Sequence, residues 1–483
     1  MEHLDREQLG ELDKESLIAI IVELREMVAK QGAQIQELQD QLAKNSQNSG
    51  KPPSSDGLKK PHTRNTRQKG KRRSGGQPGH QGHTLEMVTE PEHIVRHMVE
   101  VCPHCKTDLQ DIEPVQVEKR QVFDLPPVKI AVTEHQVESK RCPHCGHEVK
   151  GRFPDEVSQP VQYGPRIKAQ AVYLNNYQLI PLARVCELFE DFYGHAPSEA
   201  FILQANASFL EQTRPAVEAI KEHLKDAAVV HFDESGVRVE GRLNWLHVAG
   251  TDQLTYYFVH PKRGQEAMRD MAILPGFQGR AMHDHWHSYL QFENCQHAFC
   301  NAHHLRELQF ILDQYDQPWA QDMIGLLFDI KVEVDAAPPD WVALPPERVT
   351  HFEGRYDAIL QQGFKVNPLP EQPPPRKRGR KKQTPPRNLL DRLHRHQAET
   401  LAFMHDFRIP FDNNLAERDV RMIKVKQKIS GAFRTRSGAN TFCAIRSYIS
   451  TARKQGGHVI QSIHNAFSGQ PFMPFALDEL PEQ

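Results

Sequence analysis

The stretch from Val229 to Glu240, VVHFDESGVRVE, constrains the fold of this chain more than any other. Its apolar residues are β-branched or aromatic, which is typical of a buried strand. Gly236 permits a turn or bulge, and Asp233 lies where a sheet can hold a carboxylate rigidly. Such a carboxylate makes a structural hydrogen bond or coordinates a hard divalent cation through oxygen. The strand alone leaves both interpretations open.

Two other segments carry acids in comparable settings. Residues 279–290, GRAMHDHWHSYL, predict a short strand that ends at Asp284, and residues 409–422, IPFDNNLAERDVRM, predict a helix that carries Glu417. Asp284 could equally hydrogen-bond its histidine neighbours, and Asn414 with Glu417 has the spacing of a capping box. Two aspartates on strand ends and a glutamate on a helix can share a pair of Mg²⁺ ions, the arrangement for in-line phosphoryl displacement.

Four motifs carry a family resemblance: HFDESGVRV, MHDHWHSYL, CNAHHLREL and above all IPFDNNLAER. Together they resemble the DDE transposases of the insertion sequence 66 family, over nearly the whole chain. The resemblance implies a multidomain α/β protein: a ribonuclease-H-like catalytic core with an N-terminal coiled coil, a zinc ribbon and a helical insertion. It also implies that Asp233, Asp284 and Glu417 bind two catalytic Mg²⁺ ions for DNA strand cleavage and strand transfer.

Composition limits the classes of protein to consider. The chain has 483 residues, enough for about three domains, and its 34 prolines predict extended segments. No apolar run approaches the roughly 20 residues of a membrane span, and the first residues lack a signal-peptide pattern. We expect a cytoplasmic, nucleoid-associated protein without a membrane partner. The net charge of -2 excludes no nucleic-acid function, because local basic blocks matter more than the total.

Residues 1–45 predict a coiled-coil dimerisation helix. Apolar residues recur every three or four positions, with Ile21 and Val28 at position a and Leu24 at position d, a pattern that favours a parallel dimer. Gly32 weakens the middle of the repeat. We expect a homodimer or higher oligomer; the alternative is a helix packed on its own chain.

Residues 46–95 predict a basic, disordered linker. Between positions 51 and 83, nine Lys or Arg residues stand against one acid, and such a block attracts phosphates without sequence preference. A solubilising tail is the alternative. The DNA-binding candidates are Lys69, Lys71, Arg72 and Arg73.

Residues 96–155 predict a zinc ribbon. The expected ligands are Cys102, Cys105, Cys142 and Cys145. Two CxxC turns can present four thiolates to one structural Zn²⁺ in a tetrahedron. The 36 residues between the pairs exceed the usual spacing, so we expect residues 115–122 and 128–137 to form a long hairpin. Histidines close enough to substitute as ligands are His104, His144 and His147.

Residues 160–225 predict a helical domain with helix-turn-helix-like spacing. We expect three helices, with breaks near Ile180 and near residues 194–197, and with Ser198 capping the last helix. The segment FILQANASFL has no basic residue to face DNA, which favours packing against the catalytic domain.

Residues 226–335 predict the first part of the core. Strands at 243–249 and 254–259 and a helix at 264–274 precede the strand before Asp284, giving the βββαβ order that a ribonuclease-H-like sheet requires. The 133 positions from Asp284 to Glu417 are too many for one connection, so an insertion must lie between them.

That insertion includes residues 336–388, which carry a basic, proline-rich linker. Its RKRGRKK sequence is typical of an arm that lies in a narrow minor groove, although a disordered linker explains it equally well. The DNA-binding candidates here are Arg376, Arg378 and Arg380.

Residues 389–440 predict the completion of the core, and residues 441–483 a C-terminal helical tail. Basic residues share a face with Glu417 and form either a phosphate-binding stripe or a solvated surface. They are Arg421, Lys424 and Lys428, with Arg418 beside them.

The leading functional hypothesis is a transposase that acts on double-stranded DNA, both the terminal inverted repeats of an element and its target, with possible accessory proteins. A zinc-ribbon DNA-binding regulator with an inactive nuclease core is the alternative. A zinc hydrolase is disfavoured because no histidine pair has HExxH spacing. Its candidate ligands would be His231, His283, His285, His287, His303 and His304.

Overall fold

The computed structural model describes residues 12–45, 48, 84–126, 128–369 and 383–475. The chain comprises two compact units. The first comprises Met1–Thr63, Pro154–Leu188 and Ala196–Gln483, and the second comprises Arg64–Phe153 and Phe189–His195. The predicted basic linker around Lys71 and the basic arm around Arg378 lie outside the described residues.

A five-stranded mixed sheet lies at the centre of the first unit, with strand order β5-β4-β3-β6-β7. The strands are β3 (Val229–Val239), β4 (Arg242–Gly250), β5 (Thr255–His260), β6 (Arg280–His283) and β7 (Gln296–Phe299). β3, β4 and β5 are antiparallel neighbours, whereas β6 pairs parallel to both β3 and β7. The short helix α6 (Gln265–Met271) connects β5 to β6 by way of η3 (Leu274–Gly276). The sheet with its helices confirms the α/β class and the predicted βββαβ order; β7 was not predicted.

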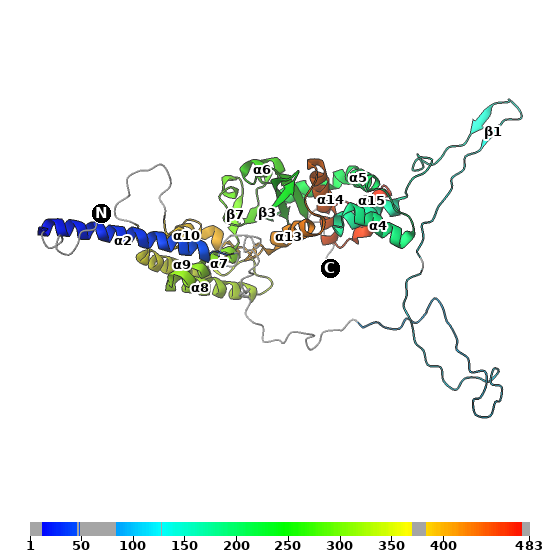
Figure 1. Ribbon diagram of the computed structural model, residues 1–483, viewed down its shortest axis with the longest axis horizontal. Helices are drawn as coiled ribbons and strands as arrows, with labels where there is room; N and C mark the ends of the chain where they lie inside the picture. The colour runs from blue at the N-terminus through cyan, green and yellow to red at the C-terminus, as the bar shows by residue number, and fades with distance from the viewer. Residues whose placement is uncertain (1–11, 46–47, 49–83, 127, 370–382, 476–483) are drawn as a thin grey trace. The chain divides into compact units, whose positions relative to one another are not determined.

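Helices cover both faces of this sheet (Figure 1). They are mainly α5 (Glu199–Asp226), α13 (Asn414–Ser430) and α14 (Arg436–Lys454). Successive side chains of β3 point to opposite faces, so Phe232 packs in a cluster with Leu224 of α5, and Val237 packs in another with Val420 of α13. Asp233 is four residues before Val237, so the two side chains lie on the same face of the strand. Asp233 therefore lies on the face that α13 covers.

A helical insertion separates β7 from α13. It contains α7 (Asn301–Tyr315), α8 (Pro318–Asp335), α9 (Pro346–Val366), α10 (Pro385–Arg395), α11 (Gln397–Thr400) and α12 (Ala402–His405). These helices share one apolar core, in which Trp319, Tyr356 and Leu390 are buried. An insertion between Asp284 and Glu417 is thus present, and its helices begin directly after β7.

The helices before and after the sheet pack together. They are α3 (Pro165–Val172), which continues into the π-helix η2 (Tyr173–Tyr177), and α15 (Val459–Phe467). Another helix, α4 (Leu182–Tyr193), follows η2 in the chain. Phe209 of α5, Tyr448 of α14 and Ile463 of α15 lie in one buried cluster. Ser198 caps α5 by accepting a hydrogen bond from the amide of Phe201 at 3.2 Å. The predicted helix breaks, the cap and the packing of this segment against the sheet's helices are confirmed.

The second unit contains a small hairpin, formed by β1 (Ser139–Arg141) and β2 (Glu148–Lys150) around the second cysteine pair. The predicted long hairpin is wrong: no strand occurs in residues 115–122 or 128–137, all of which the structure describes. Val115, Val122 and Val132 are almost fully exposed. Apolar side chains of this kind form strands when they have a surface to pack against.

Near the N-terminus, α2 (Lys14–Ala43) is a continuous helix that runs through Gly32. Ile21, Leu24 and Val28, residues of the predicted coiled-coil core, are exposed along it. None of the helices in the described residues is sufficiently long and apolar to span a membrane.

Candidate active site

The register of the parallel strands places Asp233 and Asp284 side by side. His231 of β3 pairs with Met282 of β6, so two residues further along the two strands bring Asp233 level with Asp284. Asp284 directly follows β6, whereas Asp233 lies within β3 and not at its end as predicted, at the point where pairing with β6 ends. The two carboxylates therefore meet where β3 and β6 separate. Asp284 Oδ1 accepts a hydrogen bond from the amide of Trp286 at 2.9 Å, which orients the loop after β6.

Glu417 comes to the same edge on the first turn of α13, which packs on β3 and β4. The helix start is anchored by Asn413, which is buried. Its Nδ2 donates to the carbonyl of Phe232 at 2.8 Å, and its Oδ1 pairs with His231 Nδ1 at 2.8 Å. The capping-box interpretation is wrong, because Asn414 is already the first helical residue and Asn413 makes no side-chain cap.

Several acids lie close to the buried Asp233, and their charges affect its pKa. Burial raises the pKa of Asp233 well above its usual value, and the negative charges of Glu234, Asp284 and Glu417 raise it further. A divalent cation held by carboxylate oxygens offsets such repulsion, and oxygen donors are those that Mg²⁺ prefers. The residues at this edge fit a magnesium site.

Glu234 is a buried acid that the sequence interpretation missed. Its carboxylate accepts hydrogen bonds from Arg263 Nε at 2.8 Å and from the Tyr289 hydroxyl at 2.5 Å. The Arg263 guanidinium in turn lies 4.2 Å from the ring centroid of Trp286 and 5.0 Å from that of Trp245. These contacts tie β3 to the loop that carries Asp284. The only signal in the sequence was a second acid directly after Asp233.

Three of the histidines considered for the disfavoured hydrolase differ in what they contact. His231 is occupied by Asn413, and His283 Nε2 pairs with His297 Nδ1 at 2.9 Å. His303 lies close to two of the acids. Burial lowers the pKa of His303, and the negative charges of Asp284 and Glu417 act in the opposite direction. Its ring, Cys300 Sγ and the Glu417 carboxylate offer ligand atoms within 4.8 Å of one another. This contact was not predicted.

The two cysteine pairs form matching knuckles. The Cys142 amide donates to the His147 carbonyl at 2.8 Å, and the Cys102 amide donates to the Thr107 carbonyl at 2.9 Å. A hydrogen bond with Thr107 lowers the pKa of Cys105 to about 7, which favours the thiolate that zinc requires. Within the described residues, the groups of three ligand atoms close enough for a metal do not include these cysteines, so the structure does not bring the pairs together.

The basic candidates on α13 differ in their surroundings. Arg418, Arg421 and Lys428 are exposed. Lys424 is half-buried, and its Nζ donates to the carbonyl of Gly236 in β3 at 3.1 Å. Three of the four predicted residues therefore remain accessible, whereas Lys424 is engaged in the fold.

Comparison with known families gives three matches. The family model described as "Transposase IS66 family" matches residues 160–441, which include the sheet and its three acids. The model for the "zinc-finger binding domain of transposase IS66" matches residues 100–146, and a family of unknown function matches residues 5–86. No curated protein matches the chain. The zinc-finger match supports a structural zinc in the second unit.

Proposed function

The chain belongs to the IS66 family of transposases, and from this premise we propose that Asp233, Asp284 and Glu417 are the DDE triad of a ribonuclease-H-like core. The proposed reaction is hydrolysis of DNA at the ends of an insertion sequence, followed by attack of the freed 3′-OH on target DNA. Membership supports the transposase class. The triad and its chemistry are our proposal.

One observation carries the proposal: in the parallel register of β3 and β6, Asp233 lies beside Asp284. The helix α13, which carries Glu417, covers the same face of the sheet. Divalent metal ions, when bound, would supply the Lewis acidity for in-line displacement. Asp233, Asp284 and Glu417 would hold these ions through their carboxylate oxygens. Asn413 and the Glu234–Arg263 pair act by holding these carboxylates in position.

We further propose a division of labour along the chain. Cys102, Cys105, Cys142 and Cys145 would hold a structural Zn²⁺, and residues 1–45 would join two copies through a coiled coil. The basic linker of residues 46–95, the arm near Arg378 and the exposed arginines of α13 would contact DNA phosphates. The zinc-finger match supports the first of these roles.

Cleavage of end DNA tests the triad. Asp284→Asn and Glu417→Gln preserve shape but remove a charge, so we expect Mg²⁺-dependent cleavage to fall at least about a thousandfold, because several kcal/mol of transition-state stabilisation is lost. Binding to end DNA should persist in both variants, since it depends on basic residues. The control is Asp357→Asn, which removes the charge of an exposed acid on α9.

The same assay separates the transposase from a DNA-binding regulator with an inactive core. A regulator would bind end DNA tightly, and the wild type would cleave it no faster than Asp284→Asn. If Glu417→Gln cleaves at the wild-type rate, Glu417 is not a metal ligand.

A further inference from the structure

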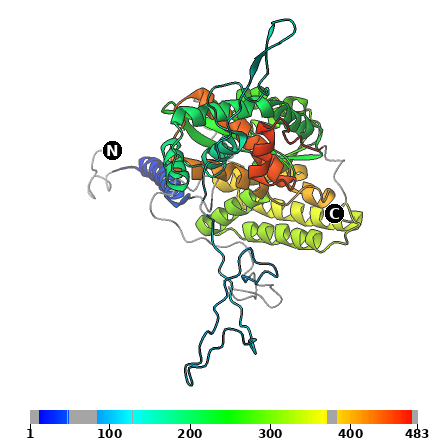
Figure 2. The same ribbon diagram turned by 90° about the vertical axis from the view of Figure 1, so that its right-hand side faces the viewer.

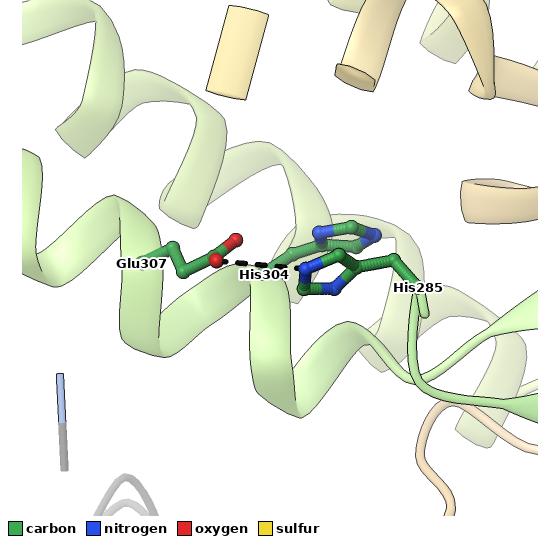
Figure 3. A group of neighbouring side chains, drawn as sticks. All are labelled: His285, His304 and Glu307. Atoms are coloured by element: carbon green, nitrogen blue, oxygen red, sulfur yellow. Dashed lines mark ion pairs between the residues drawn. The ribbon is translucent and has the colours of Figure 1, made fainter. Parts of the chain in front are cut away.

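We propose a further metal site in this protein, for Zn²⁺ or a similar imidazole-preferring divalent ion, formed by His285, His304 and Glu307. It is separate from the triad and from the cysteine knuckles. The three side chains each offer a ligand atom within 4.8 Å of the others. His304 and Glu307 lie one turn apart on α7, and His285 reaches them from the loop after β6 (Figure 3).

The burial of His304 is the first reason to assign a ligand here. Its side chain has 0% exposure, yet neither ring nitrogen has a hydrogen-bond partner among the described residues. An unpaired buried polar atom costs about 1–3 kcal/mol, so the ring of His304 indicates a missing partner. A metal ion bound to one of its nitrogens would be that partner.

The geometry of Glu307 is the second reason. Its Oε1 lies 3.7 Å from His285 Nε2, and its Oε2 accepts a hydrogen bond from Arg392 of α10. Zinc bonds to nitrogen and carboxylate oxygen are about 2.0–2.2 Å long, so two atoms 3.7 Å apart can share an ion. Arg392 would then be the outer partner of a ligating carboxylate, a common arrangement that fixes the ligand's orientation.

The donor set decides the kind of ion. Two imidazole nitrogens and one carboxylate oxygen suit zinc and its neighbours rather than Mg²⁺, which takes oxygen ligands. Such an ion would connect the loop after β6 to α7 and, through Arg392, to α10. It would thereby fasten the segment next to Asp284 to the helical insertion.

Metal analysis of the full-length protein tests the site. We expect two Zn²⁺ per chain in the wild type and one in His304→Gln, Glu307→Gln or Cys142→Ser. Combining His304→Gln with Cys142→Ser should leave none. His351→Gln, which changes an exposed histidine on α9, is the matched control and should retain two.

Two further measurements distinguish loss of the metal site from misfolding of the variants. His285→Gln alters a half-buried loop residue and should also lose one zinc while its circular dichroism stays native. In the Cys142→Ser protein, Zn²⁺ should raise the melting temperature, and His304→Gln should abolish this rise, because only an ion bound to the folded state stabilises it. A single zinc in the wild type, absent from Cys142→Ser, would overturn the proposal.

Discussion

The sheet of the first unit and the cysteine knuckles of the second are ordered by different means. Phe232 and Val237 of β3 are buried on opposite faces of the sheet, so apolar packing and hydrogen bonds within the chain hold the strand that carries Asp233. Near the knuckles, Val115 and Val132 are almost fully exposed, and the two cysteine pairs do not meet. The chain itself therefore brings the carboxylates together, and we propose that zinc binding does the same for the cysteine pairs.

The α2 helix is similar to the knuckles in this respect. Ile21, Leu24 and Val28 would be core positions of a coiled coil, yet they are exposed in a single chain. In our proposal, a second copy of the chain would cover these residues of α2, as zinc would bind the thiolates of the knuckles. Four experiments test this contrast.

Removing zinc from the knuckles should have the largest effect. Cys142→Ser should lose one zinc per chain and make residues 102–145 susceptible to proteolysis, because structural zinc contributes roughly 10 kcal/mol or more of folding energy in small modules. The melting transition of the sheet should stay unchanged. Cys186→Ser, at a half-buried cysteine outside the knuckles, is the control. Equal protease resistance in the two variants would show that the second unit is ordered without zinc.

Charge in the proposed coiled-coil seam should have the next largest effect. Leu24→Lys combined with Ile35→Lys should convert dimers to monomers by light scattering, since each buried, unpaired charge costs several kcal/mol. Glu26→Lys with Ala33→Lys places the same charges on the outer face of the same helix and should leave the dimer intact. Persistent dimers in the seam variant would place the dimer contact elsewhere.

These contrasts explain what the sequence could predict. Asp233 and its strand were predictable because the β-branched residues around it bury themselves locally, and Ser198 caps α5 through its own neighbours. The hairpin at residues 115–122 and 128–137 was mispredicted because we relied on strand propensity, and exposed residues such as Val115 and Val132 have no surface to pack against. Asn413 and Glu234 were missed because their partners, Phe232 and Arg263, are brought close by tertiary folding. His304 was noticed only as one of many histidines.

Asn413→Ala tests whether packing around the triad depends on one buried amide. The change leaves His231 Nδ1 and the Phe232 carbonyl without their partner, so the free energy of unfolding should fall by about 2 kcal/mol or more. Half-maximal cleavage should need more Mg²⁺, because the start of α13 positions Glu417. Asn414→Ala, at an exposed neighbour, should change both quantities little. Equal losses in the two variants would contradict the anchoring role of Asn413.

The smallest effect distinguishes two basic residues on α13 that the sequence placed in one phosphate-binding stripe. Arg421 is exposed, whereas burial lowers the pKa of Lys424, whose Nζ donates to Gly236. In salt titrations of end-DNA binding, Arg421→Gln should reduce the slope of log affinity against log salt by about 0.9, the value for one phosphate contact. Lys424→Gln should leave that slope unchanged and instead lower the free energy of unfolding by about 1 kcal/mol. A reduced slope in Lys424→Gln would mean that this lysine leaves Gly236 to reach DNA, and the sheet edge would then be less preformed than its contacts indicate.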